Sequence, residues 1–186
     1  MVKRVMPWMK NDGSSMTRVM IVGLRPSISG GHKSGVPLKD SKSGVFLWDA
    51  LKCIGKEEKC CYFITNLVDF ADEFNKEPTE EEKAEGLVRL KNEISDFKPN
   101  LVLCLGKVVG DEMKIPKSSR LKRDFDVLYY RVMHPAYYLR NGMHVNVFAK
   151  ELETAFDRLE KVDNLTLHVW SKRQKDWKKQ GTLLCF

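Results

Sequence analysis

Four short apolar runs recur along the chain, and each is bounded by turn-forming residues. They are RVMIVG at 18–23, CCYFITN at 60–66, NLVLCLG at 100–106 and VLYYRVM at 127–133. Runs of this length, rich in β-branched and aromatic residues, are typical of strands buried on both faces of a parallel sheet. The sequence therefore predicts a central four-stranded parallel sheet.

Segments with helical periodicity lie between and after these runs. Residues 43–55 place apolar side chains on one face, residues 79–97 begin with a capping box of Thr79 and Glu82, and residues 145–162 form another amphipathic pattern. Alternating strands and helices predict an α/β fold with three layers, α/β/α. We expect residues 1–17 to form a loose segment and residues 18–186 a single domain with a basic C-terminal extension.

The charge pattern points to a polyanionic partner. The chain of 186 residues has a net charge of +7, and basic residues cluster at 114–123 and 172–179. Such clusters favour DNA as a partner, although they also occur as plain solvated faces. No apolar stretch reaches the roughly 18 residues of a membrane helix, and no signal peptide is visible. We therefore expect a cytoplasmic protein without a membrane partner.

Metal and cofactor sites are not expected. The chain has an odd number of cysteines, five, and no two of them have Cys-x-x-Cys spacing. This pattern is typical of buried free thiols in a reducing compartment. The glycine-rich stretch after the first strand, GLRPSISGGHKSG, matches neither the dinucleotide-binding nor the P-loop spacing.

Polar side chains follow three of the predicted strands, at the edge where α/β proteins bind ligands. The loops GLRPSISGGHKSG, NLVDFAD and HPAYYLRNG bring Arg25, His32, Asn66, Asp69 and His134 to this edge. The Asn66 amide carries both donors and an acceptor, which suits the edge of a base. Each residue also has a structural alternative, such as a turn cap for Asn66 and a capping carboxylate for Asp69.

In this order and spacing, the chain resembles the uracil-DNA glycosylase superfamily from about Arg18 to Val162. The first loop, with VPLKDSKSG and VFLWDAL after it, is similar to the first motif of the iron–sulfur branches. YFITNLVDF resembles the second motif, FKPNLVLCLGK the third strand and HPAYYLR the HP[SA] motif. The resemblance implies a monofunctional glycosylase that flips a pyrimidine nucleotide and hydrolyses its N-glycosidic bond, leaving an abasic site.

The resemblance also implies roles for individual residues. The catalytic residues it implies are Asn66, His134 and Asp69, with Asp69 or His32 as alternatives for activating water. The substrate-binding residues it implies are Gly23, Leu24, Arg25, Pro26, Ser27, His32, Leu38 and Asn66. The DNA-binding residues are Lys117, Arg120, Lys122, Arg123, Tyr137, Tyr138, Leu139 and Arg140. Among these, Tyr137, Tyr138 and Leu139 are the ones that would wedge into the base stack.

Three departures from the family pattern change the expected substrate. Leu24 and Arg25 stand where many members carry an acidic residue or asparagine, Leu38 replaces a stacking phenylalanine, and the cysteines that hold an iron–sulfur cluster are missing. A guanidinium in a base pocket needs acceptors. The sequence therefore favours a bulky modified pyrimidine, such as glucosylated hydroxymethylcytosine, and a role in defence against phages.

Several alternatives remain open at this point. Arg25 could contact the DNA backbone in a protein that excises uracil during DNA repair. The chain could also be a catalytically inactive relative that binds DNA or abasic sites, or an unrelated nucleotide-binding α/β protein. We expect a monomer.

Overall fold

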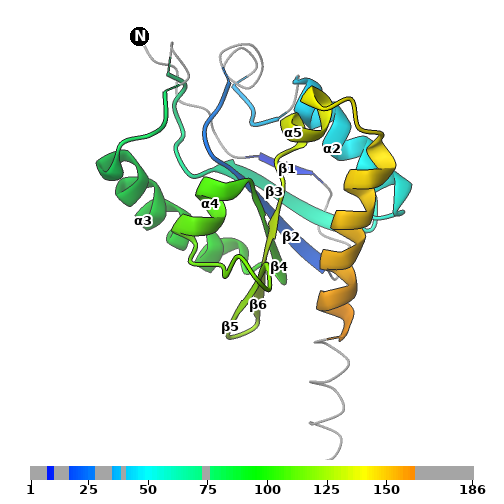
Figure 1. The fold of residues 1–186 in the computed structure, drawn as a ribbon. Coiled ribbons are helices and arrows are strands. Elements are labelled where there is room, and N and C mark those ends of the chain that lie inside the picture. Colours follow the sequence, from blue (N-terminus) through cyan, green and yellow to red (C-terminus); the bar gives the residue numbers. More distant parts are fainter. Residues whose placement is uncertain (1–7, 11–16, 28–34, 39–40, 73–75, 162–186) are drawn as a thin grey trace, which may run out of the picture.

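A six-stranded sheet forms the centre of the computed structural model, which describes residues 8–10, 17–27, 35–38, 41–72 and 76–161 (Figure 1). Its strand order is β1-β3-β2-β4-β6-β5. The strands are β1 (Trp8–Lys10), β2 (Thr17–Gly23), β3 (Cys60–Asn66), β4 (Leu101–Leu105), β5 (Leu121–Asp124) and β6 (Val127–Val132).

The four central strands are the predicted ones, and they are parallel to one another. The predicted four-stranded parallel sheet forms the centre, and β1 and β5 extend it to six strands with antiparallel edges. Neither edge strand has the apolar signature of a buried strand, since β1 has three residues and β5 carries the sequence LKRD. The expectation of a loose N-terminal segment is wrong for residues 8–10, which pair with β3.

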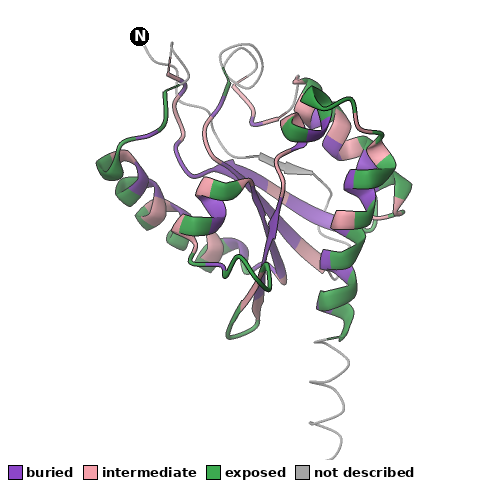
Figure 2. Cartoon of the chain, in the orientation of Figure 1, coloured by how far each residue is buried: buried purple, intermediate pink, exposed green. Residues whose placement is uncertain are grey.

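Helices cover both faces of the sheet, as the α/β/α prediction requires (Figure 1). They are α2 (Lys42–Cys53), α3 (Glu80–Phe97), α4 (Lys107–Glu112), α5 (Pro135–Arg140) and a helix at 145–161. Val19 and Ile21 of β2 pack on the face that carries α2, α5 and helix 145–161. Met20 and Val22 pack on the opposite face, with α3 and α4. The four parallel strands between these layers are mostly buried (Figure 2).

Capping residues fix the starts of α2 and α3. Ser41 caps α2 by accepting a hydrogen bond from the backbone N–H of Gly44. Thr79 and Glu82 form the predicted capping box of α3, with each side chain accepting from the other residue's backbone N–H. Both helices therefore begin within two residues of their predicted starts.

The parallel strands all end at one edge of the sheet, toward the top of Figure 1. The chain's first parallel strand, β2, lies in the middle, with β3 on one side and β4 on the other. The connections after β2 and β4 therefore leave in opposite directions, which opens a crevice at this edge. No helix in the described ranges is long and apolar enough to cross a membrane. The C-terminal extension at 162–186 lies outside the described residues.

Candidate active site

A cavity of about 170 Å3 opens at the carboxyl edge of the sheet. Its described lining residues are Arg25, Pro26, Ser27, Leu38, Ser41, Ser43, Asn66, His134 and Ala136. Six of these nine come from the predicted site, while Ser41, Ser43 and Ala136 are additions. Cavities for drug-sized ligands measure about 300–1,000 Å3, so this one suits a single flat ring better than a whole nucleotide. We call it the base cavity.

Asn66 contributes a buried amide to the base cavity from the last position of β3. Gly23 stands beside it in the parallel register, and a Cβ built on Gly23 would lie 2.3 Å from Asn66 Oδ1. Such a separation is too short for any real contact. Gly23 therefore acts by leaving room for the Asn66 side chain, and it does not line the cavity itself.

Arg89 of α3 holds the end of β3 in place. Its Nη2 donates to the backbone carbonyls of Asn66 at 2.6 Å and Leu67 at 2.9 Å, and its Nη1 donates to Thr65 Oγ1 at 3.3 Å. Glu93, one helical turn later, accepts from Nη1 at 2.5 Å and orients the guanidinium. These hydrogen bonds hold the backbone of Asn66, whose side chain lines the cavity. No motif in the sequence marks Arg89 for this role.

His134 lies at the same carboxyl edge of the sheet as Asn66, two residues after β6, where it caps α5. Its Nδ1 accepts a hydrogen bond from the backbone N–H of Ala136 at 3.1 Å. Burial lowers the pKa of His134 to about 4, and the charge of Arg140 adds to this effect. The ring is therefore neutral near pH 7, and the accepted hydrogen bond assigns its proton to Nε2.

Glu151 of helix 145–161 fastens the chain on both sides of His134. Its carboxylate accepts from the backbone N–H of Met133 at 3.2 Å, from the Tyr138 hydroxyl and from Arg120. Only 9% of the Glu151 side chain is exposed. The turn that carries His134 is thus tied to a helix behind it.

Tyr138 belongs to the core, so its prediction as a DNA wedge is wrong. Its ring packs near Phe46 and Phe148, and the residue is only 5% exposed. The segment HPAYYLR folds as a helix, and Tyr138 lies on its inner face. Tyr137 and Leu139 lie on the outer face with 37% and 38% exposure, and for them a wedge role stays a prediction.

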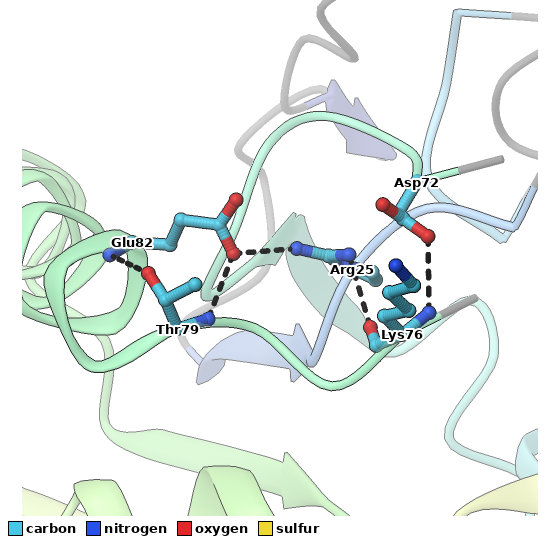
Figure 3. Close-up of polar contacts among 5 residues, drawn as sticks. All are labelled: Arg25, Asp72, Lys76, Thr79 and Glu82. Atoms are coloured by element: carbon cyan, nitrogen blue, oxygen red, sulfur yellow. Dashed lines mark hydrogen bonds and ion pairs between the residues drawn. The ribbon is translucent and has the colours of Figure 1, made fainter. Parts of the chain in front are cut away.

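Arg25 lines the base cavity, and its guanidinium is held by Glu82 and by the backbone of Lys76 (Figure 3). Its Nη2 donates to Glu82 Oε2 at 2.9 Å and its Nη1 to the carbonyl of Lys76 at 3.0 Å. The ring of Phe70 lies 5.5 Å from the guanidinium carbon, and only 8% of the side chain is exposed. The protein therefore supplies acceptors to both terminal nitrogens of Arg25, whereas its buried Nε makes no hydrogen bond with a described residue.

The structure does not bring Asp69 into the base cavity. Asp69 lines a separate, smaller cavity with Glu82, Glu85 and Arg89, and its Oδ2 lies 3.8 Å from Arg89 Nε. This position gives no support to Asp69 as the group that activates water. His32, the other residue considered for that role, lies outside the described residues.

Leu24 and Leu38, two further residues predicted to contact the substrate, differ from each other in where they lie. Leu24 packs against the core beneath α3 and does not line the base cavity. Leu38 lines it, with the left-handed backbone φ of 59°. A Cβ on Gly44 would lie 1.5 Å from the Leu38 carbonyl oxygen, so glycine at the start of α2 is what allows this loop to approach.

The predicted DNA-binding cations occupy different surroundings. Lys117 and Arg120 line a second cavity near His134. Lys122 donates to the Met113 carbonyl at 3.3 Å and Arg123 to the Phe125 carbonyl at 3.0 Å, so both are engaged along β5. Arg140 is exposed in the last turn of α5. Contact of these residues with DNA stays a prediction.

The four cysteines that the structure describes do not lie together as a set of ligands for an iron–sulfur cluster. Cys60 packs on one face of the sheet, while Cys61 and Cys104 pack on the other, and Cys53 is exposed. Within the described ranges, no three histidine, cysteine or acidic side chains gather in a way that could hold a metal ion. We therefore derive no step through a metal.

Fold and site together define an α/β protein that can take a single polar ring into a cavity between an asparagine amide and a neutral imidazole. A sequence model of the uracil DNA glycosylase superfamily matches residues 11–159. The chain therefore belongs to the uracil-DNA glycosylase superfamily. It is also 27% identical over 177 residues to the type-5 uracil-DNA glycosylase of Pyrobaculum aerophilum, in a match that covers 84% of this chain and 74% of the relative.

Proposed function

We propose that the protein is a monofunctional DNA glycosylase that flips a pyrimidine nucleotide, preferentially uracil, and hydrolyses its N-glycosidic bond. The observation that carries this proposal is the presence of Asn66 and His134 in one cavity of single-ring size. Superfamily membership and the type-5 relative support the same activity. DNA is the proposed partner, and the basic residues near the site would contact its phosphates.

The proposed reaction places catalysis on the departing base. The bond between C1′ and the base nitrogen breaks, the base leaves with the bonding electrons, and the sugar passes through an oxocarbenium-like state. Neutral His134 donates from Nε2 to a base oxygen as negative charge develops there. Removing such a donor typically slows a reaction by about 10²–10³-fold. Asn66 holds the base edge through its amide donor and acceptor.

Water completes the reaction by adding to C1′, and its proton is finally taken up by the departed base or by solvent. The nine described residues that line the base cavity include no carboxylate. An oxocarbenium ion is a strong electrophile, so water attack needs less help than departure of the base. We therefore assign the main catalytic effect to His134 and Asn66.

Uracil is the substrate that the contacts of Arg25 favour. The sequence favoured glucosylated hydroxymethylcytosine because Arg25 needs acceptors, but Glu82 and the Lys76 carbonyl already accept from its two terminal nitrogens. The cavity is also small for a base that carries a hexose. That modified base remains the second substrate to test. Its excision would indicate a role in defence against phages.

The proposal is tested by incubating the protein with uracil-containing oligonucleotides, single- and double-stranded, and with phage DNA that carries glucosylated hydroxymethylcytosine. Alkali then cleaves any abasic sites. We expect cleavage of the uracil strand, and a loss of about 10²–10³-fold in Asn66→Ala and His134→Ala. Cleavage only of the phage DNA would overturn the assignment of uracil. Release of no base, with DNA affinity retained, would instead indicate an inactive DNA-binding relative.

A further inference from the structure

One side of α3 carries a stripe of four residues that are not there for apolar packing. They are Glu82, Gly86, Arg89 and Glu93, and their spacing at successive helical turns places them one above the other. Glu82, at the start of the stripe, accepts from Arg25 in the loop after β2 at 2.9 Å (Figure 3). We call this set the α3 stripe. Its upper end is thus joined to a residue that lines the base cavity.

The middle of the α3 stripe meets the end of β3. A Cβ built on Gly86 would lie 1.9 Å from the Leu67 carbonyl oxygen, so only glycine lets the helix approach this closely. Arg89 donates to the same carbonyl at 2.9 Å, to the Asn66 carbonyl at 2.6 Å and to Thr65 Oγ1 at 3.3 Å. One guanidinium therefore contacts three consecutive residues, of which the central one lines the base cavity.

The side-chain amide of Asn66 has no comparable support of its own. The residue is only 5% exposed, yet its amide makes no hydrogen bond with any residue that the structure describes. Gly23 beside it has no side chain that could hold it. The direction of the amide therefore depends on the backbone that carries it, and Arg89 is the side chain that holds this backbone.

Two carboxylates fix the orientation of Arg89. Glu93 accepts from its Nη1 at 2.5 Å, and Asp69 Oδ2 lies 3.8 Å from its Nε. Because a guanidinium is planar and its donors have fixed directions, carboxylates on this part of the plane turn Nη2 toward the two carbonyls. Lysine has a single nitrogen and could not serve three acceptors in the same way. Asp69 thus has a structural role outside the base cavity.

We propose that Arg89 is a positioning residue for base recognition, which acts by holding the backbone of Asn66 so that its amide meets the edge of the flipped base. This inference rests on the proposed function. Arg89 does not itself line the base cavity, so its whole effect on the base passes through Asn66. Hydrogen bonds weaken steeply with distance and angle, so a small shift of the end of β3 is enough to lose those to the base.

The test measures how much the base adds to DNA binding. One oligonucleotide carries a 2′-fluorinated deoxyuridine, whose electron-withdrawing fluorine opposes cleavage of the glycosidic bond, and the other carries an abasic analogue. The ratio of the two dissociation constants is the base preference, and it does not depend on catalysis. We expect Arg89→Met to lower the base preference about tenfold. Its affinity for the abasic strand should change less than about twofold, because Arg89 is not proposed to contact DNA.

Three further variants sharpen the test. In Asn66→Ala the base preference should already be low, and adding Arg89→Met should lower it less than about twofold further. Lys91→Met is the matched control, because Lys91 is an exposed cation of the same helix, and it should keep the full base preference. Arg89→Lys keeps the charge but offers one nitrogen for three acceptors, so it should lose about threefold.

The outcomes that would overturn the proposal are specific. A full base preference in both Arg89→Met and Arg89→Lys would show that Asn66 needs no support from Arg89. An equally large further loss in the Asn66→Ala background would show that Arg89 acts on the fold as a whole. Thermal unfolding is measured for each variant, and if Arg89→Met does not unfold cooperatively, Arg89→Lys decides the question.

The two proposals can fail separately in this experiment. A base preference that depends on Arg89, in a protein that releases no base, would refute the glycosylase proposal and retain the role of Arg89. Excision of uracil with an unchanged base preference in the Arg89 variants would refute the positioning role alone. A wild-type protein without any base preference would also refute that role, because Asn66 would then hold no base.

Discussion

Replacing Gly23 by alanine tests how the base cavity is built. The new Cβ would lie 2.3 Å from Asn66 Oδ1, whereas ordinary contacts begin near 3.4 Å, so the amide must move by about 1 Å. Gly23 does not have a positive φ, and the backbone therefore accepts alanine without strain. A displacement of about 1 Å in a reacting group can cost about 10²-fold in rate. We expect Gly23→Ala to slow excision of uracil by about this factor.

The clash disappears when the amide is removed, and this provides a sharp control. In Asn66→Ala the next atom near the new Cβ is the Thr65 carbonyl oxygen at 3.9 Å, an ordinary contact. Adding Gly23→Ala to Asn66→Ala should therefore cost no further activity. The double-mutant cycle would show strong non-additivity, as expected for two residues that act through one side chain.

Single-turnover excision from a uracil-containing single strand is the assay, with thermal unfolding measured in parallel. The reasoning requires that Gly23→Ala still unfolds cooperatively, so that its lost rate reflects geometry at the site. Full activity in Gly23→Ala would refute the contact described here. A further loss in the double variant, beyond that of Asn66→Ala, would show that Gly23 acts on the substrate directly.

Three other predictions concern the residues around the site. Because the pKa of His134 is about 4 when folded and about 6.5 when unfolded, its contribution to stability is complete above pH 6.5 and is lost as the pH falls toward 4. The free energy of unfolding, measured against pH, should therefore vary less in this window in His134→Gln. Arg25→Gln should lower the free energy of unfolding in denaturant by about 1–3 kcal/mol, because it removes the partner of Glu82, while the preference for uracil over the glucosylated base stays unchanged. A changed preference would show that the Arg25 guanidinium contacts the base. Tyr138→Ala should cost about 3–5 kcal/mol of stability, whereas Leu139→Ala should spare stability and slow excision from duplex more than from single strands. Equal slowing on both substrates would argue against a wedge at Leu139.

The sequence predicted the central strands because burial on both faces leaves a continuous apolar run. The same reasoning could not find β1 or β5, since edge strands are short or polar and carry no such run. It placed Asn66 and His134 at one edge because parallel strands end together, and the cavity confirms that they do. That part of the site follows from strand direction alone, without knowledge of any side-chain contact.

Arg25 shows what strand direction cannot provide. Glu82 was expected as part of a helix cap, and it is, but the same carboxylate also accepts from Arg25 across 57 positions of sequence. The contact of Arg25 with Glu82 can be recognised only in the folded structure, because it joins two segments that are distant in sequence. Arg131 is the converse case, because a charge inside the apolar strand VLYYRVM is visible in the sequence, and Arg131 lines the second cavity with Lys117 and Arg120.

The hydrogen bonds of Glu151 limit which amino acids can replace it. One carboxylate serves the backbone of Met133, the hydroxyl of Tyr138 and the guanidinium of Arg120, and so it joins a turn, a core ring and a surface cation. Aspartate is too short to span the three, and glutamine would offer an amide donor where a second acceptor is needed. The position therefore has the lowest tolerance to substitution that we expect on helix 145–161. When a library of variants across this helix is selected for folded protein, we expect glutamate to be retained at position 151 and the exposed neighbouring positions to accept many residues.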